Sequence, residues 1–329
     1  MRGWLLEPSG GGVALRFREE LPEPHAGPGE VRLRVSACGV CRTDLHELDG
    51  ELPPPRPVVP GHQVVGRIDE VGEGVEGLHP GMRVGLPWLW SACGRCDYCR
   101  RGQENLCESP RFTGLDVDGG YAEWTVAPAE AVLPLPEIYD DVEAAPLLCA
   151  GLIGYRSLRL SGVEPGGRLG LYGFGASAHL TLQVARRLGM EVYVFSRSEA
   201  HRRLALELGA RWAGAAGEEP PHPLDGAITF APAGDLLPLA LASLRRGGTL
   251  AINAVHMDRL PEMSYGLLYH ERSLKSVANL TREDGRRFLA IAGAARLEVR
   301  ARPYPLERAP EALEAVRRSA VEGGAVLVV

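Results

Sequence analysis

The feature that most restricts the possible folds is a glycine-rich turn in the middle of the chain. The stretch GLYGFGASA places Gly173, Gly175 and Ala178 in the spacing G-x-G-x-x-A, between an apolar strand pattern and an apolar helical stripe. In a dinucleotide-binding turn, the first glycine permits the tight bend and the second lets a pyrophosphate approach the backbone. The third small residue lets the helix pack on the strand. The motif alone is weak evidence, but the next strand, EVYVF, supplies the context that favours dinucleotide binding over a purely structural turn.

The surrounding sequence predicts two kinds of architecture. EAHRRLALELGA and DLLPLALASLRRGG predict helices, DGAITFAPA and TLAINAV predict strands, and their alternation builds a doubly wound parallel sheet. The first third differs, because GEVRLRVSACGV and PGHQVVGRIDEVGEGVEGLHPGMRVGL read as short valine-rich strands broken by glycine and proline. That pattern predicts a β-rich, partly barrel-like domain. After about Asn279 the pattern leaves open whether the tail extends the parallel sheet or returns to the first domain.

Composition excludes several classes of protein. A chain of 329 residues suggests one large or two ordinary domains, and a net charge of -6 argues against a nucleic-acid-binding surface. No run of eighteen apolar residues occurs, and MRGWLLEPSGGGVALRF is too short an apolar region for a signal peptide. We therefore expect a cytoplasmic protein. In that compartment seven cysteines favour metal binding or catalysis over a disulfide framework.

Four of the cysteines lie in one loop, CGRCDYCRRGQENLC. Three of them recur at intervals of three and the fourth follows eight residues later, so their thiolates can converge on one ion. Such a set suits a closed structural zinc site, and an iron–sulfur cluster is the main alternative. The residues are Cys93, Cys96, Cys99 and Cys107.

The other three cysteines are less easily assigned from spacing. Cys38 and Cys41 belong to CGVCRTDLH, which suits a redox pair, a metal site or part of a larger site. A catalytic zinc needs three protein ligands and an open position. Besides Cys41, the candidates are His62 in PGHQVVG and Cys149 in APLLCAG. Each by itself is more often a buried core residue, and spacing does not bring them together.

Taken in order along the chain, these motifs resemble those of the medium-chain zinc-dependent alcohol dehydrogenases, in particular a short bacterial subset. The resemblance runs from CGVCRTDLH through PGHQVVG, the four-cysteine loop, GGYAEW, CAG and the glycine turn. It implies an α/β protein with a Rossmann doubly wound parallel sheet and a β-rich, partly barrel-like (GroES-like) catalytic domain. Residues 1–149 and 280–329 would form the zinc-binding catalytic domain, and residues 150–279 the dinucleotide-binding domain.

The resemblance also implies roles for single residues. Cys41, His62 and Cys149 match the ligands of the catalytic zinc, a ligand set known for alcohol dehydrogenase, and Cys38 is then an additional thiol. Asp44 matches the carboxylate that orients His62. The other matches are Thr43, which bonds the substrate oxygen, His46, at the outer end of a proton relay, and Arg42, a cofactor-phosphate contact in some members. The implied reaction transfers a hydride between an alcohol and NAD(P), with two zinc ions per chain.

The end of the strand EVYVF predicts a preference for NADP over NAD. An NAD-binding fold usually carries Asp or Glu there, but this chain has Ser196 followed by Arg197. Arginine can pair with the additional phosphate, and Arg202 could add positive potential. Glu199 could still reach the ribose, which leaves NAD as the alternative.

The resemblance further implies a homodimer or homotetramer, with TLAINAV as a candidate strand for the contact. Gln63 departs from the family pattern, because many members carry glutamate after the ligand histidine, and slower turnover would follow. The arginine often found before the last strand is absent from EGGAVLVV. Trp88 and Trp90, near a pocket position of some members, favour an apolar alcohol or aldehyde of modest size. The alternatives are a non-catalytic or slow relative and a zinc-ribbon nucleic-acid-binding protein, which the acidic balance opposes.

Overall fold

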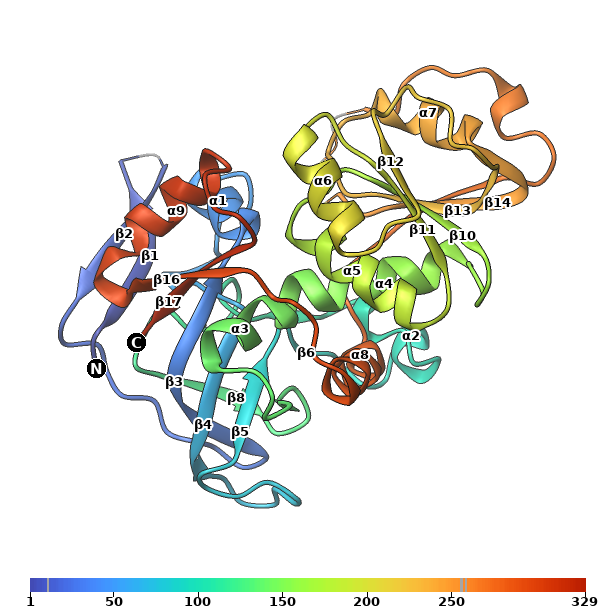
Figure 1. Cartoon of the computed structure of the whole chain (residues 1–329). Helices are drawn as coiled ribbons and strands as arrows, with labels where there is room; N and C mark the ends of the chain where they lie inside the picture. Colours follow the sequence, from blue (N-terminus) through green and yellow to red (C-terminus); the bar gives the residue numbers. More distant parts are fainter. Residues whose placement is uncertain (11, 255–256, 258) are drawn as a thin grey trace. The chain divides into compact units, whose positions relative to one another are not determined.

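The computed structural model describes residues 1–10, 12–254, 257 and 259–329 (Figure 1). Two compact units divide the chain: unit 1 holds Met1–Cys149 and Leu280–Val329, and unit 2 holds Ala150–Asn279. Each unit has a sheet and a hydrophobic core of its own. Among the described residues, no helix is both long and apolar enough to span a lipid bilayer.

Unit 1 is built on a largely antiparallel sheet in the order β16-β17-β3-β4-β5-β9, with β8 also paired to β3. The central strand alternates buried and more exposed positions along Val31, Leu33 and Val35, as expected for a half-buried strand. The strands are β3 (Glu30–Val40), β4 (Val64–Val71), β5 (Arg83–Leu86), β8 (Trp124–Pro128), β9 (Leu133–Pro134), β16 (Ala301–Pro305) and β17 (Gly324–Val328). Two small antiparallel pairs accompany them, β1 (Gly3–Ser9) with β2 (Gly12–Arg18), and β6 (Leu89–Ser91) with β7 (Arg111–Phe112).

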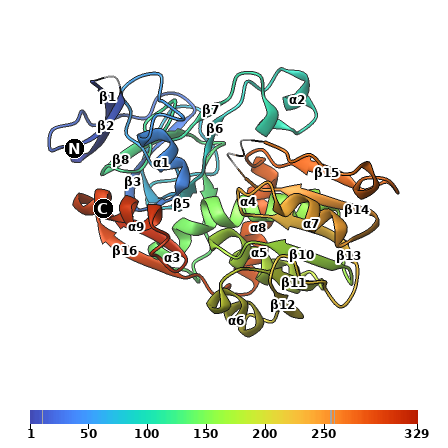
Figure 2. The same ribbon diagram turned by 90° about the horizontal axis from the view of Figure 1, so that it is seen from above.

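The C-terminal tail completes the unit 1 sheet, which settles the question that the sequence pattern left open. β17 pairs antiparallel with β3, placing Leu327 opposite Cys38, and β16 pairs parallel with β17. The helical elements of unit 1 are α1 (Arg42–Leu48), α2 (Asp97–Arg100), η1 (Glu104–Leu106), α3 (Asp141–Pro146), α8 (Arg282–Ala294), η4 (Leu306–Arg308) and α9 (Ala309–Arg317). A π-helical turn, η2 (Leu147–Gly151), follows α3 directly. Figure 2 shows α2 and its loop extending beyond the seven-stranded sheet.

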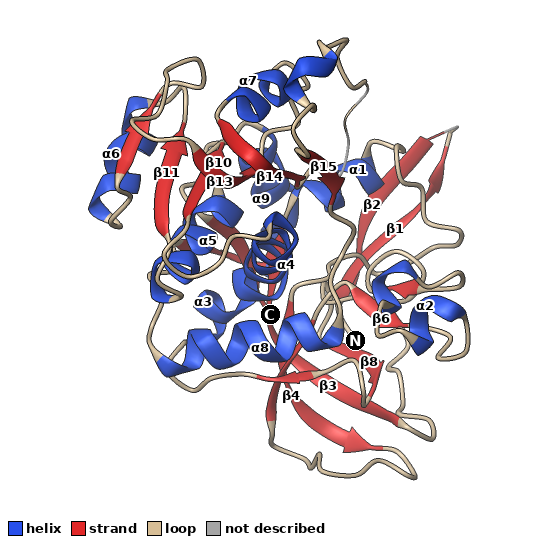
Figure 3. Cartoon of the chain, turned by 90° about the vertical axis from the view of Figure 1, so that its right-hand side faces the viewer, coloured by secondary structure: helices blue, strands red, loops and turns tan. Residues whose placement is uncertain are grey.

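Unit 2 is a parallel sheet in the order β12-β11-β10-β13-β14-β15. Its strands are β10 (Arg168–Tyr172), β11 (Glu191–Phe195), β12 (Trp212–Gly214), β13 (Leu224–Thr229), β14 (Leu244–Ile252) and β15 (Ser273–Ser276). Its helical elements are α4 (Leu152–Ser161), α5 (Ala176–Arg187), α6 (Glu199–Glu207), α7 (Leu236–Ala242) and η3 (Tyr265–Leu267). α4 and α5 pack together on one face and α7 lies on the other (Figure 3). Helices on both faces explain why β10, β11 and β13 are buried along most of their length.

Two expectations from the sequence need correction in unit 2. The stretch TLAINAV belongs to β14, whose neighbours β13 and β15 occupy both of its edges, so it cannot pair with a second subunit. Its last residue, Val255, lies outside the described residues. The helix expected over DLLPLALASLRRGG ends at Ala242, and the arginine pair already belongs to β14. Leu244 pairs in register with Leu224 of β13, so strand pairing overrides the helical pattern there.

Candidate functional site

Cys41 lies where β3 ends and α1 begins, and its side chain caps the helix. The Cys41 sulfur accepts a hydrogen bond from the Thr43 backbone N–H at 3.3 Å, while the Asp44 carboxylate accepts one from the Cys41 N–H at 2.7 Å. This reciprocal pair satisfies two backbone donors that a helix start leaves open. The cap therefore fixes the direction in which the thiol points.

His62 is positioned by the glycine before it. Gly61 has a φ of +96°, and a Cβ on it would lie 2.3 Å from the Tyr121 ring and 2.8 Å from the Cys38 sulfur. Only glycine fits both the backbone conformation and the space. The His62 ring is 1% exposed and packs edge-on against Trp88 at 4.9 Å between centroids.

Cys149 comes from the π-helical turn η2, a local widening of the helix that is frequent at functional sites. The ligand atoms of Cys41, His62 and Cys149 all lie within 4.8 Å of one another. The Cys41 sulfur is 3.2 Å from His62 Nε2. The structure thus brings together three residues that lie far apart in the sequence and that spacing could not connect.

The charges of this group are strongly coupled. A hydrogen bond from the Cys149 thiol, opposed by burial and helped by the nearby His62, holds the pKa of Cys41 well below its usual value. The pKa of Cys149 is raised well above its usual value by the same hydrogen bond and by burial. Burial would lower the pKa of His62, but the Cys41 thiolate and the Asp44 carboxylate raise it to about 10. The group therefore attracts positive charge.

Behind the three ligands lie two buried carboxyl groups on one face of α1. Asp44 Oδ1 is 3.6 Å from His62 Nδ1, and burial followed by the Cys41 charge raises the pKa of Asp44 to about 7. Glu47, one turn further on, is 0% exposed. Within the described part of the chain neither of its carboxylate oxygens has a hydrogen-bond partner. Burial, and then the charge of Asp44, raises the pKa of Glu47 well above its usual value.

The remaining residues expected from CGVCRTDLH take separate positions. Thr43 and His46 are half-buried on α1 and are three residues apart, so they are neighbours on one helix face. His46 Nδ1 lies 2.6 Å from Glu51 Oε2. Arg42 is exposed and donates a hydrogen bond to the Ser319 hydroxyl at 3.0 Å. Cys38 is fully buried in the unit 1 core and does not belong to the group of three ligand atoms.

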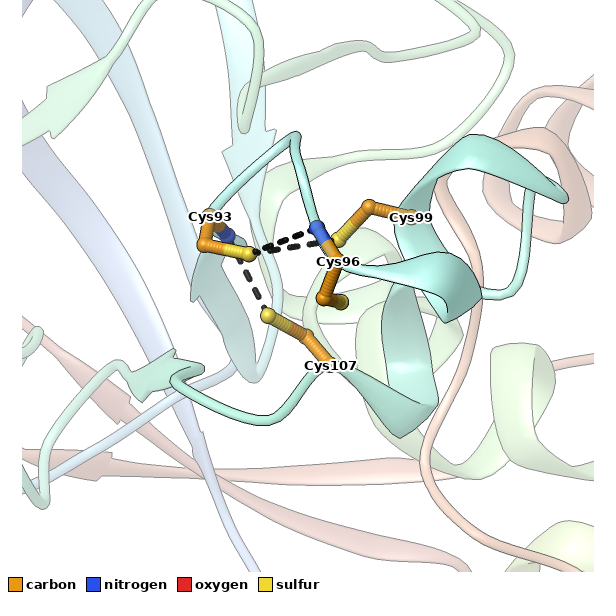
Figure 4. A group of neighbouring side chains, drawn as sticks. All are labelled: Cys93, Cys96, Cys99 and Cys107. Atoms are coloured by element: carbon orange, nitrogen blue, oxygen red, sulfur yellow. Dashed lines mark hydrogen bonds between the residues drawn. The ribbon is translucent and has the colours of Figure 1, made fainter.

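The four-cysteine loop forms a second cluster, in which the ligand atoms of Cys93, Cys96, Cys99 and Cys107 lie within 4.8 Å of one another (Figure 4). Sulfurs about 2.3 Å from a central zinc would stand about 3.8 Å apart in a tetrahedron, and those of Cys93 and Cys99 are 4.0 Å apart. Backbone N–H groups of Arg95 and Cys96 lower the pKa of Cys93 to about 6. The cluster thus fits a tetrahedral thiolate site.

The glycine turn in unit 2 has the geometry that its sequence predicts. Gly173 has a φ of +90° at the end of β10, and Gly175 is the N-cap residue of α5. Among the described residues, no atom outside Gly175, its chain neighbours and the backbone of α5 lies within 4 Å of the place that a Cβ on Gly175 would occupy. Ala178, in the first turn of α5, is fully buried. The backbone at the start of this helix is therefore open to a phosphate group.

At the end of β11, Ser196 is buried and Arg197 is exposed. Arg202 does not point away as an independent cation, because its guanidinium donates hydrogen bonds to the carbonyls of Ser196 at 2.7 Å and Arg197 at 3.2 Å. Glu199 lies 3.7 Å from Arg203 in an exposed ion pair.

Sequence reasoning missed two residues of the site. Glu47 follows CGVCRTDLH directly, but a glutamate on a short helix is normally exposed, so nothing signals its burial. Glu51 contacts His46 only because the chain turns back after α1. Of the two tryptophans, only Trp88 packs against His62, since Trp90 donates its Nε1–H to the Val126 carbonyl and stacks under Arg111.

The sequence and the fold of this chain are similar to those of known alcohol dehydrogenases. Residues 27–137 match the family model of the alcohol dehydrogenase GroES-like domain. The chain is 49% identical to "Probable alcohol dehydrogenase AdhA" of Mycobacterium tuberculosis, over 100% of this chain and 97% of that protein. A cobalt- and zinc-bound thermostable alcohol dehydrogenase from Pyrobaculum aerophilum is 26% identical, with a TM-score of 0.88 over 100% of this chain and 99% of that one. A protein of Sinorhizobium meliloti described as a zinc-binding dehydrogenase, bound to NADP, is 27% identical, with a TM-score of 0.85 over 99% of both chains.

Proposed function

The chain belongs to the medium-chain zinc-dependent alcohol dehydrogenase family, and from that premise we propose that it transfers a hydride between a small alcohol and NAD(P). In this reaction the alcohol gives a hydride to NAD(P)⁺ and a proton to the protein, and an aldehyde or ketone forms. The observation that carries the proposal is the convergence of Cys41, His62 and Cys149 beside α1.

The three ligands fit a catalytic zinc. Two sulfurs and one imidazole nitrogen form the ligand set of alcohol dehydrogenase, a set named for that enzyme class in general. Asp44 Oδ1 and His62 Nδ1, both buried, face each other at 3.6 Å, as in a carboxylate that orients a metal-bound histidine. A zinc ion held there supplies a Lewis acid for the alcohol oxygen.

Proton transfer falls to two residues of α1. We assign Thr43 as the hydroxyl that bonds the substrate oxygen, and His46 as the outer acceptor that passes the proton to water. Their spacing of three residues places both on one face of α1, while the side chains of Asp44 and Glu47 are buried. One short helix thereby carries both the proton path and the metal support.

A second zinc per chain is proposed for the four-cysteine loop. All four positions of a tetrahedral ion would be filled by sulfur, so this ion would stabilise the fold and take no part in chemistry. The loop also contributes Glu104, which accepts a hydrogen bond from the Arg282 N–H at the start of α8 at 2.8 Å. Zinc here would therefore also hold the C-terminal tail of unit 1.

We propose NADP as the preferred cofactor. Gly173, Gly175 and Ala178 would accommodate the pyrophosphate, and Arg42 would contact a cofactor phosphate. Ser196 offers a hydroxyl where NAD-binding folds carry a carboxylate, and Arg197 is exposed beside it. Because Arg202 is bound to the loop backbone, its role would be to shape this turn. Arg197→Ala should lower the NADP to NAD ratio of kcat/KM about tenfold, the value of one charge-assisted contact, and an unchanged ratio would contradict the assignment.

For the substrate we propose an apolar alcohol or aldehyde of modest size. Trp88 packs its ring against His62 and stacks on Phe112 at 4.9 Å, so a rigid aromatic wall stands next to the ligand group. Trp90 takes no part in this wall. Trp88→Ala should therefore extend the range to bulkier alcohols, whereas Trp90→Ala should not.

A homo-oligomer is also proposed, and it would use β15 in place of TLAINAV. β15 is one of the two edge strands of the described unit 2 sheet. The segment before it exposes Leu260, Tyr265 and Tyr269, and Tyr265 is 74% exposed. An edge strand with exposed apolar residues suits subunit pairing. The cytoplasmic location stays a prediction.

The decisive experiment combines metal analysis with a substrate panel. Purified protein should contain two zinc ions per chain and should oxidise primary, secondary or aromatic alcohols with NADP or NAD. Cys41→Ser should abolish turnover and remove one zinc ion. Zinc-loaded protein that turns over none of these alcohols, and reduces none of the matching aldehydes, would contradict the proposal.

A further inference from the structure

We propose that Glu51 is a positioning residue that holds His46 in the tautomer and orientation needed to accept the substrate proton. The inference rests on the proposed function, because it takes His46 as the outer end of the proton path. It adds a carboxylate to that path, supplied by the turn that ends α1.

The contact itself assigns the tautomer. His46 Nδ1 lies 2.6 Å from Glu51 Oε2. An ionised carboxylate can only accept hydrogen bonds, so in the neutral ring Nδ1 carries the proton and Nε2 carries the lone pair. The nitrogen that faces away from Glu51 is therefore the one that can take a proton.

The backbone explains why this contact persists. Gly50 ends α1 with a φ of +76°, and its N–H donates to the Glu47 carbonyl at 3.2 Å. The N–H groups of Glu51 and Leu52 both donate to the His46 carbonyl, at 2.9 and 3.0 Å. This is the paired hydrogen-bond pattern of a left-handed glycine cap. It places the Glu51 and His46 side chains next to each other before they interact.

An exposed ion pair usually contributes little, because two long side chains must be ordered to form it. Here Glu51 is 50% exposed and His46 is 24% exposed, but the cap has already ordered both backbones. The neighbouring carboxylate, Asp49, is bound on both oxygens by Arg317 at 2.7 Å. Glu51 is thus the carboxylate that hydrogen-bonds to His46, and Asp49 provides a matched control.

The proton step balances without any further reactant. His46 Nε2 takes one proton during alcohol oxidation, which gives an imidazolium with N–H groups at both nitrogens. The Nδ1–H stays hydrogen-bonded to Glu51, so the new positive charge forms beside a carboxylate. The proton at Nε2 then passes to bulk water and the neutral ring is restored. No electrons move in this step.

The test compares Glu51→Gln, Glu51→Asp and Asp49→Asn, in wild type and in a His46→Gln background, at low buffer concentration and saturating cofactor. Glu51→Gln should lower kcat/KM for alcohol oxidation about three- to tenfold, the effect of one hydrogen bond of typical net strength. Glu51→Asp should restore most of that loss. Added imidazole, a soluble proton acceptor, should raise the rate of Glu51→Gln more than that of wild type.

Asp49→Asn should lower the melting temperature and leave kcat/KM unchanged, and Glu51→Gln should have no further effect when His46 is already glutamine. A slow His46→Gln enzyme with a wild-type rate for Glu51→Gln would overturn this inference alone. An equal loss from Glu51→Gln in both backgrounds would also overturn it, since Glu51 would then act without His46. If His46→Gln itself turns over at the wild-type rate, the proton path in the proposed function is wrong.

Discussion

Replacing Glu47 by glutamine should stabilise this protein, and the gain should grow with pH. Glutamate and glutamine have nearly the same shape, so the substitution removes a titrating group and leaves the packing intact. Both carboxylate oxygens of Glu47 are buried and without a hydrogen-bond partner in the described part of the structure. Burying a carboxylate in that state is unfavourable, so the side chain is protonated when the chain is folded.

The sign follows from the direction of the shift. Burial and the charge of Asp44 raise the pKa of Glu47 in the folded state well above its usual value, while in the unfolded chain it stays at about 4.3. Below the unfolded pKa the group is protonated in both states and contributes no pH dependence. Above it, folding must take up a proton, so the wild type loses stability as pH rises until the folded pKa is reached.

One proton corresponds to a slope of about 1.4 kcal/mol per pH unit, so the difference in unfolding free energy between the two proteins should grow with pH inside that window. Bound zinc would not remove the effect, because the two thiolates of Cys41 and Cys149 would balance its charge. The assay is urea unfolding of zinc-loaded wild type and Glu47→Gln from pH 5 to pH 7, where the difference between their unfolding free energies should grow with pH. Glu207→Gln, an exposed glutamate on α6, is the control and should show no growing difference. Parallel stability curves for wild type and Glu47→Gln would refute the reasoning.

Four further substitutions probe the proposed metal sites and the residues that support them. Cys96→Ser should remove one of two zinc ions and lower the unfolding midpoint, because structural zinc binding is coupled to folding; elemental analysis beside a urea titration measures both, and a full zinc content would contradict the assignment. Gly61→Ala should destabilise the fold by more than the about 1–2 kcal/mol of a left-handed alanine, because its Cβ would also lie 2.3 Å from Tyr121. Cys38→Ala should keep the zinc content, whereas Asp44→Asn should weaken zinc affinity about 10- to 100-fold. Competition with a chelator measures the zinc affinity of both variants. Loss of zinc in Cys38→Ala would reverse the assignment of the ligand cysteine within CGVCRTDLH.

Prediction from the sequence is most reliable where the residues of a motif are close in the chain and the local backbone conformation requires those residue types. The glycine turn is an example. Gly173 adopts a positive φ that glycine tolerates best, and the hydrophobic periodicity on either side of it predicts the strand and the helix. The four-cysteine loop is another, because all of its ligand atoms come from one short segment. In both cases the chemistry is local in the chain.

Prediction from sequence fails where long-range pairing decides. β14 reads as a possible edge strand, but β15 covers it through a segment whose apolar pattern is short and weak. The arginines of SLRRGG join β14 because Leu244 pairs with Leu224 across the sheet. The pairing of β17 with β3 likewise joins strands far apart in the chain, and hydrophobic periodicity does not indicate which strands pair.

Helix α1 shows how much of this site depends on the two ends of one short segment. Cys41 caps its start and would also ligand zinc, so metal binding and helix direction share one side chain. Gly50 ends it in the left-handed conformation that brings Glu51 to His46. A seven-residue helix has little stability of its own, so these caps and its packing must hold it. Breaking the cap at Cys41 or at Gly50 should therefore disturb the proposed metal support and the proposed proton path together, although no residue between the caps is altered.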